Sequence, residues 1–303
     1  MIKPLLQHDA FLADVAAAGA DTSRPHLWWL GQSGYLAQFR GKHLLIDPYL
    51  SDSLTKKYTG TDKPHVRMSE IVVDPARLDF IDVVSSSHNH TDHLDVETIG
   101  PVRRANPNLK IIVPAANRAF AADRLKVDPA SLIGMDDGAS QMVEGFTFHG
   151  VPSAHEQVER DERGHLKYMG YVIEFNQRAV TSSCTAAPMR SADAAAQQDE
   201  KRWTIYHSGD TILFDGMADR LKPFKVDLAL LPINGRAPER RTAGNLWGRE
   251  AAQLAHDIGA RLVVPCHYDM FAFNTATSAE FIAACEGLRQ PYRVLRLGER
   301  IEL

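Results

Sequence analysis

The sequence predicts an α/β protein in which sheets are layered on one another and flanked by helices. Short apolar segments rich in branched and aromatic residues follow one another in the first part of the chain, which is typical of buried strands. Further on, such segments alternate with segments whose apolar residues recur at helical spacing. The chain of 303 residues can bury a sizeable core, and it contains neither a clear linker nor an internal repeat. We therefore expect one domain over residues 1–303.

The first 25 residues are expected to form an N-terminal helix. They begin MIKPLLQHDAFLADVAAAGA, in which Pro4, His8, Asp9 and Asp14 interrupt the apolar run that a signal peptide requires. No segment approaches the roughly 18 consecutive apolar residues that span a bilayer. A cytoplasmic protein without a membrane span is therefore predicted.

Strands are expected where apolar runs end at glycine, proline or polar residues. Residues 26–48 contain two or three of them. The other predicted strands lie at 78–87, 109–114, 146–153, 167–175, 202–208, 226–233, 261–268 and 292–299. Helices are predicted at 96–107, 115–125, 248–260 and 278–288. Two segments fit neither pattern: residues 51–70 are predicted to form a loop over a site, and residues 176–202 a surface insertion.

A dense cluster of donor groups follows the strand predicted at 78–87. The stretch SSSHNHTDHLD contains His88, His90, Asp92 and His93 within six positions. A strand that runs into a tight loop can direct His88 and His90 at one point, and Asp92 and His93 at a second. Imidazole and carboxylate are ligands for Zn, Mn, Fe or Co. The alternative is a polar loop with histidines by chance, and the donors elsewhere in the chain make it less favoured.

Three more segments place donor groups where a predicted apolar strand ends. Loops at the ends of strands are where α/β proteins build their sites. The donors are His149 and His155, His207 and Asp210, and His267 and Asp269.

The HNHTDH stretch, together with HSGD and VVPCHYD downstream, resembles the metallo-β-lactamase fold superfamily and its HxHxDH signature. WWLGQSGYL, IYHSGD and VVPCHYDMF further resemble the branch that contains L-ascorbate-6-phosphate lactonase. The resemblance runs from about Trp28 to Leu297. It implies a four-layer αββα sandwich and a site for two divalent metal ions, Zn or Mn, with Fe less favoured.

The resemblance also implies a ligand set. The ligands of one ion would be His88, His90 and His155, those of the second ion Asp92, His93 and His267, and Asp210 would bridge the two. His155 is preferred to His149 because it follows the predicted strand and the Pro152 turn. His149, His207 and Tyr268 are expected behind the ligands, where partners fix the tautomer of ligating histidines.

Cys266 is interpreted as a small buried residue and not as a ligand. It directly precedes His267, so on an extended chain it points to the opposite side. The three cysteines, Cys184, Cys266 and Cys285, are far apart and predict no disulfide framework.

The predicted function is hydrolysis by a metal-bound hydroxide, because two ions lower the pKa of the water between them. Asp92 is the candidate catalytic residue, which orients the nucleophile and carries a proton to the leaving group. The resemblance favours a lactonase for a small sugar-acid lactone, with or without a phosphate. The alternatives are a phosphodiesterase of the phospholipase D-like branch, a di-iron oxidoreductase on the same fold, and a metal-binding protein without activity.

Substrate contacts are predicted in the loop INGRAPERRTAGN, which follows a strand. Guanidinium groups bind phosphate or carboxylate in a bidentate manner. Arg236 is the first choice because it lies closest to the strand end, and the other candidates are Asn234, Arg240, Arg241 and Asn245. The alternative is a solvated loop. The expected partner is a small molecule, because a net charge of −4 gives no reason to expect nucleic acid. A homo-oligomer is allowed but not specified.

Overall fold

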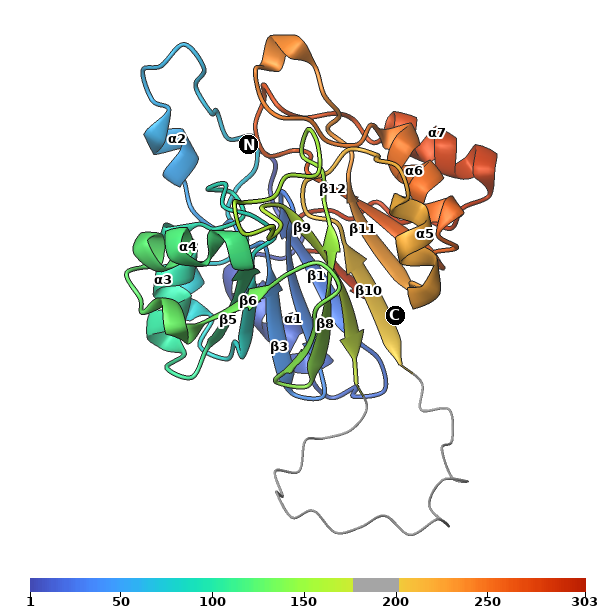
Figure 1. Ribbon diagram of the computed structural model, residues 1–303. Helices are drawn as coiled ribbons and strands as arrows, with labels where there is room; N and C mark the ends of the chain where they lie inside the picture. Colours follow the sequence, from blue (N-terminus) through green and yellow to red (C-terminus); the bar gives the residue numbers. More distant parts are fainter. Residues whose placement is uncertain (177–201) are drawn as a thin grey trace, which may run out of the picture.

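The computed structural model describes residues 1–176 and 202–303, and they form two sheets packed face to face between helices. Figure 1 shows helices α3 and α4 on one side of the pair of sheets, and α5, α6 and α7 on the other. The αββα sandwich expected from the sequence is therefore confirmed. The insertion predicted at 176–202 lies, apart from its two end residues, outside the described residues.

The first sheet has seven strands, antiparallel at one end and parallel at the other. Its order is β13 (Arg300–Glu302), β1 (His26–Gly31), β2 (Gly34–Phe39), β3 (Lys42–Ile46), β4 (Val83–Ser85), β5 (Lys110–Pro114) and β6 (Leu132–Met135). The strands from β3 to β6 are parallel. Every residue of β1 and β2 is buried, because one face meets the second sheet and the other meets a helix layer.

The second sheet has six strands and the mirrored arrangement. Its order is β12 (Leu262–Cys266), β11 (Leu228–Pro232), β10 (Trp203–His207), β9 (Met169–Phe175), β8 (Phe146–Pro152) and β7 (Ser140–Val143). Strands β10, β11 and β12 are parallel, and the others are antiparallel. The parallel parts of both sheets therefore present the carboxyl ends of several strands, which is where an α/β protein places its site.

The helices cover the outer faces of the two sheets. Helix α4 packs on β5 and β6, and α6 packs on β11 and β12. The α-helices are α1 (His8–Ala18), α2 (Ser53–Lys57), α3 (Val96–Ala105), α4 (Arg118–Leu125), α5 (Met217–Leu221), α6 (Gly248–Asp257) and α7 (Ala279–Leu288). The 3₁₀ helices are η1 (Pro75–Arg77), η2 (Ala115–Asn117), η3 (Pro129–Ser131), η5 (Lys222–Phe224) and η6 (Pro238–Arg240). Among the described residues, none of these helices has the length and apolarity that crossing a membrane requires.

Aromatic side chains from both sheets fill the space between them. The ring of Phe175 lies 6.1 Å from that of Phe39 in the other sheet and 5.1 Å from that of Phe146. A smaller apolar cluster lies apart from this core and is made by Tyr49, Leu54, Met270 and Phe271. It holds the loop after β3 against the loop after β12.

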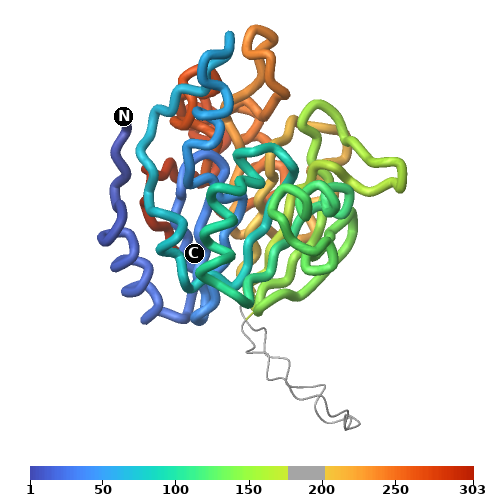
Figure 2. The backbone as a smooth tube through the Cα atoms, turned by 90° about the vertical axis from the view of Figure 1, so that its left-hand side faces the viewer, coloured from blue at the N-terminus to red at the C-terminus, as the bar shows by residue number. Residues whose placement is uncertain are grey.

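Two expectations about elements were wrong in part. The N-terminal helix covers only His8–Ala18, and the residues before it run beside the segment near Ser69, with a bridge from Ile2 (Figure 2). Residues 292–299 do not form a strand: the Leu295 carbonyl accepts a hydrogen bond from the Tyr268 hydroxyl, and the chain turns just after it. Strand β13 follows that turn.

Candidate metal centre

Four segments bring their donor groups to one place, at the carboxyl ends of strands from both sheets. The loop after β4 carries four donors, and the segments after β8, β10 and β12 carry one each. All seven side chains expected from the sequence lie there: His88, His90, Asp92, His93, His155, Asp210 and His267.

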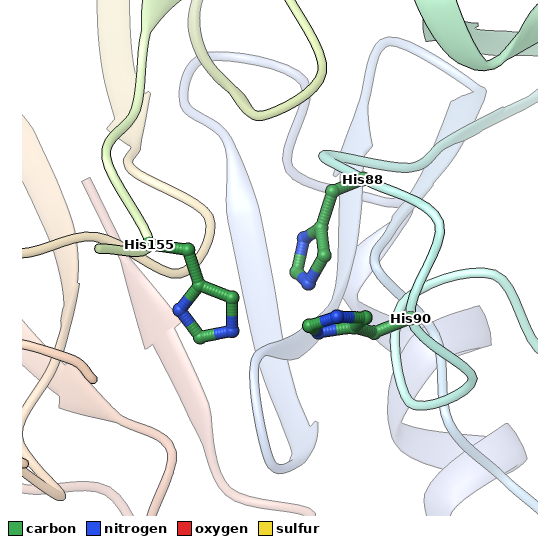
Figure 3. Close-up of side chains that lie close together, drawn as sticks. All are labelled: His88, His90 and His155. Atoms are coloured by element: carbon green, nitrogen blue, oxygen red, sulfur yellow. The ribbon is translucent and has the colours of Figure 1, made fainter. Parts of the chain in front are cut away.

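Three histidines form the first group. One ring nitrogen each of His88, His90 and His155 lies within 4.8 Å of the others, and Figure 3 shows the rings converging from two separate segments. Burial lowers the pKa of His88 well below its usual range and that of His90 to about 4. Both imidazoles are therefore neutral near pH 7, which is the form that binds a metal.

The second group is formed by Asp92, His93 and His267, whose ligand atoms also lie within 4.8 Å of one another. Asp210 lies between the two groups. One of its carboxylate oxygens is 3.2 Å from His267 Nε2 and 3.7 Å from His155 Nε2, and the other is 3.3 Å from His93 Nε2. A carboxylate in this place can contact ions in both groups.

The chemistry of the donor set fits divalent cations. His88 Nε2, His93 Nε2 and Asp210 Oδ1 are buried and make no hydrogen bond of normal geometry with the described residues, which costs about 1–3 kcal/mol for each group. Burial disfavours a charge on His93, but the carboxylates of Asp210, Asp92 and Asp47 outweigh it and raise its pKa well above the usual range. A bound cation would neutralise the negative charge of these carboxylates and would coordinate the ligand atoms that make no hydrogen bond.

Asp47, which was missed in the sequence, fixes the second group from behind. This fully buried residue follows β3, and its Oδ2 accepts hydrogen bonds from His93 Nδ1 at 2.6 Å and from Ser87 Oγ at 2.5 Å. Its Oδ1 accepts from the Ser87 amide at 2.7 Å. The bond to Nδ1 leaves Nε2 facing the cluster, as in other carboxylate–histidine–metal arrangements. The only sequence signal was a carboxylate at the end of the apolar run HLLID.

Gln32 was also missed, and it connects the β1–β2 turn to the site. Its side-chain amide donates to Asp92 Oδ2 at 2.8 Å and lies 3.1 Å from His267 Nε2. The backbone carbonyl of Gln32 accepts from the His267 amide at 2.9 Å and from Trp29 Nε1 at 3.0 Å. A polar residue in the tight turn GQSG between two buried strands was its signal.

The three residues expected behind the ligands have different surroundings. His207 contacts backbone beside the site: its Nε2 donates to the Ser33 carbonyl at 2.9 Å, and its Nδ1 accepts from the Gly209 amide at 3.2 Å. Tyr268 stacks on Trp29, which holds the Gln32 turn. His149 does not support the ligands, which corrects the prediction, because its contacts are Glu174 and Phe224. As a residue inside β8, it points away from the strand end.

Cys266 is buried, as expected, and is not among the grouped donors of the described residues. Burial raises the pKa of its thiol well above the usual range. Among the described residues, the site is therefore built from imidazole and carboxylate.

A cavity of about 870 Å³ opens over the donors, with His90, Asp92, His155 and Asp210 in its wall. Tyr168 also lines it, with its ring 5.3 Å from that of His88 and 5.5 Å from that of His155. The sequence did not single out this tyrosine, because it precedes a strand of ordinary apolar composition. The 51–70 loop lies over the site as expected, and seven of its residues line the cavity.

The predicted substrate contacts need correction at three positions. Arg236 makes a bidentate ion pair with Glu250, with both distances 2.7 Å, and it does not line the cavity. Arg240 is bonded to the carbonyls of Asn234 and Thr275, and Asn234 donates to Asn274.

Neither Asn234 nor Arg240 lines the cavity, whereas Arg241 and Asn245 do. The backbone of this loop, by contrast, reaches the site, because the Gly244 carbonyl accepts from His155 Nδ1 at 2.9 Å.

Comparison with known proteins gives the same picture. The sequence model of the family described as the beta-lactamase superfamily domain matches residues 42–268. A UPF0173 metal-dependent hydrolase from Caldivirga maquilingensis is 28% identical over 270 residues, which cover 89% of this chain and 93% of that one.

Two solved structures share the fold. Isothiocyanate hydrolase from Delia radicum gut bacteria matches with a TM-score of 0.66 and 19% identity, over 91% of this chain and 98% of that one. Igni18, a metallo hydrolase from Ignicoccus hospitalis, matches with a TM-score of 0.61 and 20% identity, over 93% and 99%. At these identities the two structures bear on the fold alone.

Proposed function

The chain belongs to the beta-lactamase superfamily and is a metal-dependent hydrolase, and from this premise we propose that it opens the cyclic ester of a small anionic acid. The observation that carries the proposal is the cavity, which has the seven donors at its base and basic side chains in its wall. Lys57, Lys63, Arg124 and Arg241 all line it.

We assign His88, His90 and His155 to one ion and Asp92, His93 and His267 to the second, with Asp210 between them. Zn and Mn both accept imidazole and carboxylate ligands. Bound divalent ions acidify water and polarise the carbonyl group of an ester. The hydrogen bonds that His93 donates to Asp47 and that His155 donates to the Gly244 carbonyl hold the two rings ready to bind the ions.

Two side chains of this protein are placed to act on the substrate itself. Asp92 lines the cavity and accepts a hydrogen bond from Gln32 on Oδ2, which leaves its other oxygen to hold a proton during ring opening. Tyr168 lines the cavity above the three histidines, and burial raises the pKa of its hydroxyl. A hydroxyl that stays protonated can donate a hydrogen bond to the substrate carbonyl oxygen as negative charge develops there.

The test is hydrolysis of a matched panel: sugar-acid lactones with and without a phosphate, the corresponding open-chain esters, and phosphodiesters. We expect lactone opening that stops on chelation and returns with Zn or Mn. Asp92→Asn should remove this activity. Turnover of phosphodiesters with none of any lactone would overturn the proposal.

A phosphodiesterase is the second candidate, and one observation favours it. Phe120 lines the cavity and is 45% exposed, with the Arg124 guanidinium 4.4 Å above its ring. An exposed aromatic side chain beside a cation at the cavity mouth suits a phosphodiester that carries an apolar group. The phosphodiester arm of the same panel decides between the two candidates.

A further inference from the structure

One part of the cavity wall is made of aromatic rings from the 51–70 loop and the loop after β12. Tyr58 and His65 of the 51–70 loop are stacked with their centroids 4.0 Å apart. The His65 ring meets the edge of Phe273 at 4.5 Å and that of Phe271 at 5.2 Å. All four rings line the cavity, and they rest on the small apolar cluster that includes Leu54. The wall is therefore fixed by packing on both of the loops that form it.

Basic side chains stand at the edge of this wall. The Lys63 ammonium lies 5.2 Å from the centroid of Phe273 and donates to the Arg241 carbonyl at 2.6 Å. Arg241 is paired at 2.9 Å with Asp62, where both side chains are exposed. Lys57 lies near the Tyr58 ring, and no carboxylate partner is found for it among the described residues. The side chains of Lys57, Lys63 and Arg241 therefore bring three cations to this part of the cavity wall, where Asp62 supplies one carboxylate.

We propose that this part of the cavity is a binding subsite for the anionic portion of the substrate, a carboxylate or phosphate next to a ring with an apolar face. The subsite rests on the proposed function, since it would orient the ester toward the donor groups. Lys63 and Arg241 bind the anion, and the ring of the ligand packs on Phe273 and Tyr58. The substrate anion is therefore bound by the 51–70 loop and Arg241, and not by Arg236.

Charge and desolvation support this occupant. Burial and, after it, the charge of Arg241 lower the pKa of Lys63. The two cations therefore repel each other, and an anion bound between them would be stabilised by both. The ion pair between Arg241 and Asp62 is exposed, and such pairs are worth only about 0–1 kcal/mol. An incoming anion can therefore take Arg241 from Asp62 at little cost. Burial also lowers the pKa of His65, which keeps its ring neutral as part of an apolar wall.

The experiment measures binding of benzoate, benzamide and acetate to metal-free protein by NMR titration. Removing the ions ensures that a carboxylate does not bind through a metal. We expect benzoate to bind at least about tenfold more tightly than either other probe, because benzamide lacks the charge and acetate lacks the ring. Lys63→Gln and Arg241→Gln should each weaken benzoate by about tenfold and leave benzamide unchanged. Phe273→Leu should reduce the preference for benzoate over acetate.

Arg236→Gln is the matched control, because this arginine lies in the same loop but is paired with Glu250 outside the cavity. It should not change any of the three affinities. Equal binding of benzoate and benzamide, or loss of benzoate binding in the Arg236 variant alone, would overturn the subsite. The binding assay does not depend on turnover. If benzoate binds as expected but no lactone is hydrolysed, the proposed reaction is wrong and the subsite still stands.

Discussion

Single residues behind the ligands set the geometry of the site. The carboxylate of Asp47 bonds His93 and both the amide and the hydroxyl of Ser87, the residue before His88. One buried side chain thus orients donors of both groups.

Asp47→Asn should therefore weaken metal binding by about 10–100-fold, because the amide keeps the size of the side chain but removes the charge that fixes the His93 tautomer. Competition with a chromophoric chelator measures the affinity. Asp227→Asn is the control, since Asp227 accepts from the Thr204 amide at the opposite end of β10. Equal losses in the two variants would assign Asp47 to general stability.

Tyr168→Phe should lower kcat for the preferred ester by about 100-fold, the usual effect of deleting one donor to a developing oxyanion. The ring remains, so its packing against the histidines and the metal content should not change. Tyr292→Phe, which removes a hydroxyl that donates to Glu286 outside the cavity, serves as the control. Unchanged kcat in Tyr168→Phe would mean that the tyrosine contributes only its ring.

At this scale the sequence predicts the donors well and their supports poorly. His88, His90, Asp92 and His93 share one short loop, so their spacing alone indicates a cluster. The partner of His93 is 46 residues away in the chain, and nothing in the sequence connects the two. Arg236 was predicted as the anion contact because of its place after a strand, but its true partner, Glu250, lies on the first turn of α6.

At the scale of elements, the site depends on close approach between the end of β4 and the end of β10. The Gly209 backbone has a φ of +61°, and a Cβ there would lie 2.6 Å from Ser87 Cβ and 2.8 Å from the Met169 carbonyl. Only glycine therefore lets Asp210 reach the donors of the β4 loop.

Gly209→Ala should destabilise the fold by about 2–5 kcal/mol, from the left-handed backbone and from overpacking against Ser87. It should also reduce metal binding, since Ser87 bonds Asp47. Gly164→Ala is the matched control, because Gly164 has a φ of +85° and open space around it, so it carries only the backbone strain. Denaturant unfolding of both variants gives the comparison, and equal destabilisation would argue against crowding at Ser87.

The buried strands could be predicted because apolar side chains cover both of their faces. Strands β6 and β7 were missed, since both are edge strands and three of the four residues of β7 are exposed. The segment 292–299 has the composition of a strand, but it pairs with β12 only through an isolated bridge at Tyr292, and with β1 only through Gly298 and Glu299. Between these points the Leu295 carbonyl accepts from the Tyr268 hydroxyl and the chain turns. The amino-acid composition of a segment indicates whether it is buried, whereas its hydrogen bonding in a sheet depends on where the other strands lie.

At the scale of the whole molecule, each of the two sheets contributes part of the site. The charged groups of one sheet interact with those of the other, as His93 does with Asp210. Asp92 and His93 come from the first sheet, and Asp210 and His267 from the second. The carboxylate neighbours of His93 outweigh burial and hold its pKa well above the usual range, so we expect His93 to carry a proton near neutral pH in the metal-free site.

A cation must displace that proton, so metal affinity should rise as the pH increases from 6 to 8. His88 and His90 have lowered pKa values and are already neutral in this range, so they add little to the dependence. Calorimetry in two buffers of different ionisation enthalpy should show about one proton released on filling the second group. Metal binding without proton release would mean that His93 is neutral in the metal-free protein.

Metal content, measured by plasma mass spectrometry on protein loaded with Zn or Mn and freed of excess ion, tests the two-ion site most directly. We predict two ions per chain in the unaltered protein and fewer than one in Asp210→Ala, because the carboxylate that offsets repulsion between the ions is lost from both groups. Activity should follow occupancy through chelation and reloading. No bound metal in the unaltered protein, or two tightly held ions in the variant, would contradict a site in which Asp210 joins two ions.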